Sequence, residues 1–572
     1  MTSIDPVVSP ADAAAALFDR IRSAPAELWI TLRDEADVRA DLESVQRRAT
    51  EGAELPLAGA TFAVKDNIDV AGLPTTSAHP ALSRVAERNA TVVQRLVDAG
   101  AVVVGKTNMD QFATGLVGAR SPYGAVTSPV HPDRVAGGSS SGSGAVVGWG
   151  IVDFSLGTDT AGSGRVPAAF NRIVGLKPTL GSLPLDGVLP ASPSYDTVST
   201  FAPTVAMAAA VFAVAAGPAD ADHRSRSWSQ GAPLAAPPRP VVAVPSEADL
   251  VTLSPGMRAA FADAVARAEL LGAEVRAIDL SACLEASTLL YDGGLVAERA
   301  WSFGSFLAEH PDEADPSVAS IASAAGSVGG VAVVDGQQRL LELAAAARRE
   351  RAGTDALLLP TTPLHPTSAA VAADPLGVNR LLGTFTNFVN LMDLAAVAVP
   401  VSTVPGEGEF GVSFVTDAFH DQVAIDLAAR FVGEPEPALV SVAPGHDVAV
   451  FGAHLRGEPL NAQLVELGAR YVRDVSTAPA FRMLLVEGSV DRPAVVRSGD
   501  GRELPGELWR LSPLAVTHLL DSIAAPLALG RIELADGSVV IGFTASVDGT
   551  ERDITDHGGW RAFRAASAAA AR

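Results

Sequence analysis

The chain has 572 residues, 48% of them hydrophobic, which is enough apolar material for two or three buried cores. Its 65 acidic and 42 basic residues give a formal net charge of −23, which argues against nucleic acid or an anionic membrane as a partner. The sequence predicts neither a membrane span nor a secretory leader. Its single cysteine, Cys283, excludes an internal disulfide, and we expect a cytoplasmic protein.

The N-terminal part predicts alternating helices and strands. Residues 9–23 predict a helix with Ser9 as its N-cap, and residues 61–70 predict a short buried strand that leaves Lys65 at its end. A helix over 89–100 and a strand over 101–107 follow directly. Strand, helix and strand with short joins are typical of an α/β fold, so we expect a mixed β-sheet core covered by helices on both faces.

The rest of the chain predicts two domains joined by a linker. Composition assigns residues 218–240 to a surface loop, and residues rich in Glu-Pro pairs mark a linker at 436–446. Beyond it, short apolar runs with turn signals between them predict a small β-rich domain with one helix near 514–523. The expected domains are therefore 1–435 and 447–572.

Two glycine-rich runs organise the sequence. Ser139 opens the run GGSSSGSG, Ser163 closes TDTAGS 24 positions later, and Lys65 stands 74 positions before Ser139 in AVKDN. The first run alone has the composition of a flexible linker, but apolar segments flank it. Lysine can act as a base only when neutral, and burial at a strand end lowers its pKa from about 10.4.

These serines and this lysine, at this spacing, resemble the amidase signature family, which cleaves amide C–N bonds with a Ser–cisSer–Lys triad. The resemblance implies that Lys65 accepts a proton from Ser139, which follows a cis peptide, and that Ser163 attacks the carbonyl. It implies no metal and no organic cofactor. It also assigns the oxyanion hole to four backbone amides, those of Thr160, Ala161, Gly162 and Ser163.

Two further segments are similar to allophanate hydrolases, a group within that family. Residues 108–126 resemble the substrate-side segment, and residues 287–301 carry Tyr291 and Arg299 at the spacing of the residues that hold the substrate. An arginine fork suits the carboxylate of allophanate, a urea that bears a carboxylate. The alternative is a helix with an outward arginine.

The C-terminal part resembles the domain that follows the amidase domain in allophanate hydrolases. Its run FGAHLRGEPLN is also similar to a loop of γ-glutamylcyclotransferase-like folds, but Ala524 stands where their catalytic glutamate falls. The resemblance implies ammonia release from allophanate to give N-carboxycarbamate, with His454 as a candidate proton donor or anion binder in its decarboxylation. His454 as a packed loop residue is the alternative.

Three functions stay open at this point. The first is hydrolysis of allophanate, a small-molecule substrate, by a homodimer. The second is another activity of the family, as a broad-specificity amidase or a glutamine-hydrolysing amidotransferase subunit. The third is a catalytically inactive scaffold.

Overall fold

The computed structural model describes residues 9–440, 442–547 and 551–570, and it divides into two compact units. Unit 1 comprises Met1–Ser227 and Arg239–Val440, and unit 2 comprises Trp228–Pro238 and Ser441–Arg572. The sequence placed 228–238 in a loop of the first domain. In the structure Leu234 of this segment is fully buried, and its amide donates to the Gly468 carbonyl at 2.8 Å, so the segment packs within unit 2.

One eleven-stranded sheet forms the core of unit 1, in the order β1-β5-β2-β6-β8-β7-β12-β13-β11-β9-β10. β2 runs parallel to both β5 and β6, whereas β8 is antiparallel to β6, so the sheet is mixed. The strands are β1 (Trp29–Leu32), β2 (Thr61–Lys65), β5 (Val102–Thr107), β6 (Phe154–Asp159), β7 (Val174–Lys177), β8 (Thr197–Ala202), β9 (Val241–Pro245), β10 (Glu274–Ile278), β11 (Ala356–Pro360), β12 (Ala395–Val404) and β13 (Gly408–Thr416), with β3 (Pro74–Thr75) and β4 (Arg84–Val85) in a separate hairpin.

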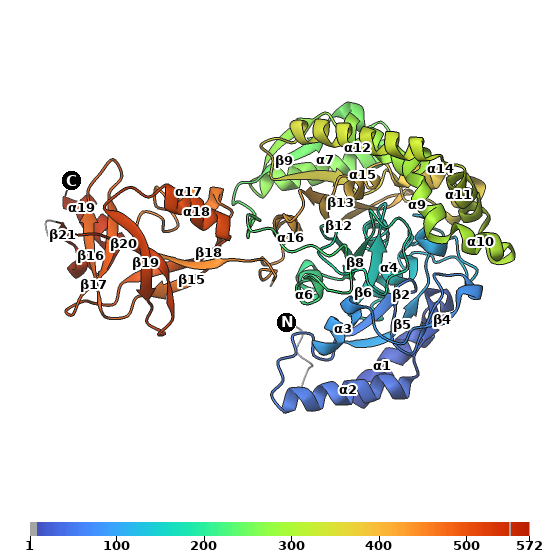
Figure 1. The fold of residues 1–572 in the computed structure, drawn as a ribbon, viewed down its shortest axis with the longest axis horizontal. Coiled ribbons are helices and arrows are strands. Elements are labelled where there is room, and N and C mark those ends of the chain that lie inside the picture. The colour runs from blue at the N-terminus through green and yellow to red at the C-terminus, as the bar shows by residue number, and fades with distance from the viewer. Residues whose placement is uncertain (1–8, 441, 548–550, 571–572) are drawn as a thin grey trace. The chain divides into compact units, whose positions relative to one another are not determined.

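Helices cover both faces of this sheet (Figure 1), which confirms the predicted fold class. The first helix begins where the sequence predicted, because the Ser9 side chain accepts a hydrogen bond from the Asp12 amide at 3.1 Å. The helices are α1 (Pro10–Ser23), α2 (Glu35–Thr50), α3 (Thr91–Asp98), α4 (Ser141–Gly148), α5 (Val166–Phe170), α6 (Val205–Ala215), α7 (Pro255–Leu270), α8 (Ser281–Asp292), α9 (Ala297–Arg299), α10 (Ser305–Glu309), α11 (Pro316–Gly326), α12 (Gly330–Glu350), α13 (Ser368–Ala373), α14 (Gly377–Leu382), α15 (Asn387–Leu391) and α16 (Asp421–Val432).

The centre of the sheet explains where polar groups gather. Every residue of β2, β5 and β6 is buried, as expected for strands covered on both faces. Since β2 and β6 are parallel neighbours, their carboxyl ends meet at one edge of the sheet. Lys65 and Asp159 end these two strands, so the buried charged groups converge there.

Unit 2 is the β-rich domain that the sequence predicted. It contains a five-stranded sheet in the order β15-β18-β14-β20-β19 and a three-stranded sheet in the order β17-β16-β21. Its elements are β14 (His446–Val450), α17 (Asn461–Glu466), β15 (Arg470–Ser476), β16 (Phe481–Val486), β17 (Arg492–Arg497), β18 (Pro505–Leu511), α18 (Pro513–Asp521), β19 (Leu527–Glu533), β20 (Val539–Ala545), β21 (Arg552–Asp553) and α19 (Trp560–Ala570). Within the described ranges, no single helix has the length and apolarity of a membrane span; α11 and α12 meet that test only as a pair bent by 100°.

Candidate active site

Lys65, Ser139 and Ser163 form one line of hydrogen bonds inside unit 1. Lys65 Nζ donates to Ser139 Oγ at 2.8 Å, and Ser139 Oγ donates to Ser163 Oγ at 2.9 Å. A second bond from Lys65 Nζ, to Thr158 Oγ1 at 2.8 Å, fixes the amine from the side. The structure therefore brings together the three residues that the sequence singled out, although they come from β2, the segment before α4 and the turn after β6.

The lysine of this line is completely buried and forms no ion pair with any carboxylate of the described residues. Burial lowers the pKa of Lys65 from 10.5 to about 7, because a charged amine loses its hydration there. Asp110, Asp159 and Asp196 oppose this shift through their negative charges. At neutral pH a large fraction of the amine is therefore uncharged, which is the form that can accept a proton.

Asp159 holds the turn that carries Ser163. Its carboxylate accepts the amides of Gly162 at 2.9 Å and Gly164 at 2.8 Å, and it accepts two bonds from the Arg165 guanidinium at 3.0 Å each. Burial acts most strongly and raises the pKa of Asp159, but the charge and hydrogen bonds of Arg165, the charge of Lys177 and the Gly164 amide together hold that pKa below its ordinary value. The carboxylate therefore stays ionised beneath the turn.

The predicted oxyanion donors are not equivalent in this geometry. The Gly162 amide is already bonded to Asp159. Among the hydrogen bonds of the described residues, none is donated by the amides of Thr160, Ala161 or Ser163. These three N–H groups are therefore free to bind an oxygen atom beside Ser163.

The glycines before Ser139 are needed for space. The Gly138–Ser139 peptide is cis, as the resemblance implied, and Gly137 has φ +77°, a conformation that favours glycine. A Cβ atom on Gly138 would overlap the Asp110 carboxylate and lie 2.6 Å from the Gly118 amide. No side chain fits there, so the first glycine-rich run is part of a packed site rather than a linker.

Arg299 is buried and has spare donors. It extends from α9, donates from Nη1 to Thr114 Oγ1 at 3.2 Å, and lies over the ring of Tyr291 with its Cζ 4.8 Å from the ring centre. Its Nε and Nη2 atoms have no hydrogen-bond partner, and no carboxylate of the described residues pairs with it. Thr114 precedes Gly115, whose carbonyl accepts from Ser163 Oγ at 3.5 Å, so Arg299 is connected to Ser163 through two hydrogen bonds and two adjacent residues.

His454 occupies a tight environment in unit 2. Its ring stacks on Phe543 with 4.6 Å between centres, and its Nε2 lies 3.0 Å from Gln463 Oε1. Burial lowers the pKa of His454 and so disfavours its charged form. The cavity that His454 lines together with Arg492 has a volume of only about 10 Å³.

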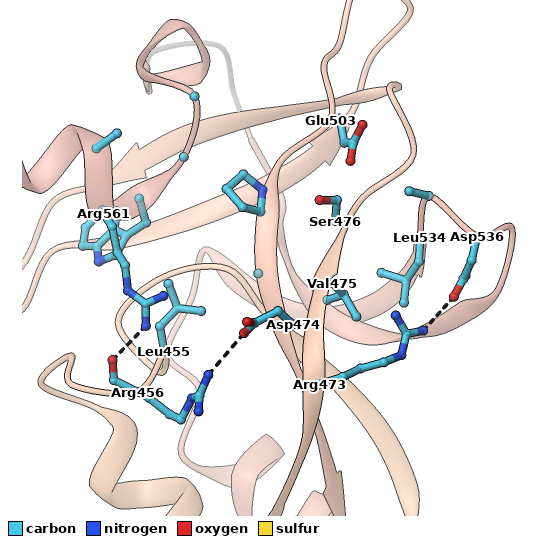
Figure 2. A pocket seen from close by; sticks show the side chains of 17 residues that line it. Leu455, Arg456, Arg473, Asp474, Val475, Ser476, Glu503, Leu534, Asp536 and Arg561 are labelled. Atoms are coloured by element: carbon cyan, nitrogen blue, oxygen red, sulfur yellow. Dashed lines mark hydrogen bonds and ion pairs between the residues drawn. The ribbon is translucent and has the colours of Figure 1, made fainter.

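A larger cavity of unit 2, of about 700 Å³, is lined in part by Leu455 and Arg456, which directly follow His454 (Figure 2). Its arginines are already paired: Arg456 donates to Asp474 at 3.2 Å, and Arg473 donates to Asp536 at 2.6 Å. The sequence did not signal this cavity.

Several groups around Lys65, Ser139 and Ser163 were not predicted from the sequence. Thr158 could have been found, because it is the first residue of TDTAGS and directly precedes Asp159. Asp110 and Asp196 lie in separate loops, where no local pattern marks a buried carboxylate. In the described ranges, no group of three or more His, Cys, Asp or Glu residues is placed to hold a metal ion.

A buried line of one lysine and two serines at the edge of a mixed sheet is consistent with an amide hydrolase. The chain belongs to the amidase family: the family model described as Amidase matches residues 12–424, and the model described as Allophanate hydrolase C-terminal domain matches residues 446–565.

Known proteins resemble the chain over both units or over the first alone. The crystal structure of Kluyveromyces lactis allophanate hydrolase is 35% identical, with a TM-score of 0.87, and the match covers 98% of this chain and 97% of that one. Urea amidolyase from Saccharomyces cerevisiae is 36% identical over 96% of this chain, which spans only 32% of that relative's length. A glutamyl-tRNA(Gln) amidotransferase subunit from Symbiobacterium thermophilum is 34% identical over 74% of this chain and 92% of its own length.

Proposed function

We propose that the chain hydrolyses allophanate, releasing ammonia in unit 1 and leaving N-carboxycarbamate, whose decarboxylation unit 2 assists. The likeness to allophanate hydrolase over both units supports this substrate. The observation that carries it is Arg299, a buried guanidinium with two unpartnered nitrogens and a hydrogen-bonded connection to Ser163.

The first step follows from the hydrogen-bonded line. When Lys65 is neutral, both bonds reverse, so Ser163 passes its proton to Ser139 as Ser139 passes its own to Lys65. Ser163 Oγ then bonds to the carbonyl carbon, and the three free amides of the turn stabilise the oxygen that becomes negative. The C–N bond breaks, the departing nitrogen takes the proton back along the same line, and ammonia leaves. Water releases N-carboxycarbamate from Ser163 by the same relay.

Arg299 is the reason for proposing a substrate that carries a carboxylate beside its amide. Leaving a guanidinium buried and unpaired is costly, whereas a carboxylate could accept from Nε and Nη2 together as a bidentate pair. Tyr291 packs under the same guanidinium and supports its orientation, and we propose that its hydroxyl binds the urea part. A neutral amide would leave the guanidinium unsatisfied.

The decisive experiment compares ammonia release from allophanate, urea, a simple aliphatic amide and glutamine. We expect turnover of allophanate well above the others. Arg299→Gln should raise KM for allophanate about tenfold to hundredfold, because charge-assisted hydrogen bonds contribute roughly 1.5–3 kcal/mol. Arg380→Gln, at an exposed arginine paired with Asp292, is the matched control. Faster turnover of glutamine or of the aliphatic amide would replace the proposed substrate.

The second step is tested separately in unit 2. We propose that His454 donates a proton or binds the anion during decarboxylation of N-carboxycarbamate. His454→Ala should then slow carbon dioxide release while ammonia release stays at the parent rate. Carbon dioxide released as fast as by the parent would leave His454 as a packing residue.

The compartment, the oligomeric state and the source of the substrate also belong to the proposed function. We propose a cytoplasmic homodimer, which light scattering of the purified chain tests directly. The chain spans about a third of the curated urea amidolyases it matches. A reaction that supplies allophanate, by carboxylating urea or by hydrolysing a larger ureide, must be provided by other protein segments.

A further inference from the structure

Asp196 lies at the end of the loop 191–196, directly before β8, and its carboxylate is buried. Its Oδ2 accepts the Ala191 amide at 2.9 Å, and both oxygens accept the Ser192 amide at 3.1 Å. Its Oδ1 accepts the hydroxyl of Thr160 at 2.5 Å. Every one of these contacts is a donor pointing at the carboxylate, so Asp196 is held in place as an acceptor.

The bond to Thr160 matters because Thr160 begins the turn that ends at Ser163. Asp159 fixes the later part of this turn through the Gly162 amide. Asp196 fixes its beginning from a different loop, through the side chain of the residue whose own amide is free to bind an oxyanion. The turn is therefore held at both ends by buried carboxylates.

The two carboxylates differ in their counter-charges. Asp159 forms an ion pair with Arg165 at 3.0 Å, whereas no cation of the described residues lies within ion-pair distance of Asp196. Burial raises the pKa of Asp196, and the charge of Arg299 acts against that rise. Asp196 in turn favours the protonated form of Lys65. Its charge thus faces both the general base and the substrate-side arginine.

The same loop contacts the helix of Arg299 directly. The Ser194 amide donates to Glu298 Oε2 at 3.0 Å, and Glu298 immediately precedes Arg299 on α9. The loop therefore touches the nucleophile turn through Asp196 and the substrate-side helix through Ser194.

We propose that Asp196 is a positioning residue that aligns the Thr160 amide for the oxyanion and sets the charge balance between Lys65 and Arg299. The role in aligning substrate rests on the proposed function, whereas the effect on Lys65 applies to any amide that the enzyme hydrolyses.

The test uses Asp196→Asn and the pH profile of kcat/KM. Besides Asp196, the charged groups that face Lys65 are Asp110 and Asp159, and both stay in the variant. Loss of the Asp196 charge should move the acid limb of the profile to lower pH, by about 0.5–1 unit, and should lower kcat at least roughly tenfold. A purely structural residue would lower kcat without moving the limb. A limb that stays at the parent position overturns the proposal.

Thr160 supplies the matched pair of variants. Thr160→Val removes the hydroxyl but keeps the Asp196 charge, so kcat should fall roughly tenfold to hundredfold while the limb stays in place. Thr160→Ser keeps the hydroxyl and should restore most of kcat. Parent-like kcat in Thr160→Val also overturns the proposal. If the enzyme prefers another amide, the pH profiles are measured with that amide. Failure of the allophanate assignment can then be told apart from failure of the role proposed for Asp196.

Discussion

Replacing Lys65 by methionine separates what this lysine does for chemistry from what it costs in stability. In the unfolded chain the pKa of Lys65 is 10.5, and in the folded chain it is about 7, because burial penalises the charge. The penalty is absent above pH 10.5 and complete below pH 7. Between these values the unfolded chain holds a proton that the folded chain lacks, so the free energy of unfolding rises by about 1.4 kcal/mol per pH unit. From pH 7 to pH 9 this amounts to about 2 kcal/mol.

The assay is urea unfolding of the parent and of Lys65→Met at pH 7, 8 and 9, followed by tryptophan fluorescence. Every other titrating group is present in both proteins, so its effect cancels in the difference between their free energies of unfolding. The parent should gain about 2 kcal/mol on the variant across this range, although the variant has lost its activity. Parallel stability curves for the two proteins would refute the assignment of Lys65 as a buried amine with a lowered pKa.

Two further predictions follow from the same site. In the parent, kcat/KM should fall tenfold per pH unit on the acid side of about pH 7, because only neutral Lys65 accepts a proton; a limb near pH 4 to 5 would point to a carboxylate as the base instead. Gly138→Ala should abolish ammonia release, since its Cβ would overlap the Asp110 carboxylate, whereas Gly326→Ala, with open space around its Cβ, should keep parent activity; an active Gly138→Ala would contradict this packing.

The sequence was sufficient to predict those parts of the site that depend on local patterns. The strand that ends at Lys65 follows from the apolar residues 62–64 before the polar run at 65–67, and the α1 boundary follows from Ser9. The order of strand, helix and strand over 61–107 predicted an α/β sheet, in which the structure pairs β2 with β5 in parallel. Each of these predictions used the pattern of neighbouring residues rather than contacts between distant ones.

Long-range contacts could not be predicted in this way. The Arg165 guanidinium donates to Asn390 Oδ1 at 2.8 Å across 225 positions, and no local pattern around Asn390 marks it. The segment 228–238 has the composition of a loop, but composition does not tell which unit buries Leu234. Tertiary packing alone decides such contacts, so they were found only in the structure.

The other two lysines of the chain can be compared with Lys65, the proposed catalytic base. The chain has three lysines, Lys65, Lys106 and Lys177, and all three are fully buried, so arginine supplies every other basic side chain. Lys106, on the strand beside Lys65, forms an ion pair with Asp66 at 3.4 Å. Lys177 donates to backbone carbonyls at 2.6 and 2.7 Å. Only Lys65 contacts a hydroxyl that leads to a second hydroxyl.

This difference predicts that the same substitution to methionine mainly lowers stability at Lys106 and mainly abolishes activity at Lys65. Lys106→Met leaves the Asp66 carboxylate buried without its cation, which should lower the free energy of unfolding by about 3 kcal/mol at pH 7. Lys65→Met removes a buried amine that has no ion pair, so it should cost much less stability and yet abolish ammonia release. Urea unfolding and an ammonia assay on both variants measure the two effects together. If Lys65→Met is as unstable as Lys106→Met, Lys65 serves mainly to stabilise the fold. The proposed relay requires the opposite, because an amine that accepts a proton must not be needed as the positive partner of a buried carboxylate.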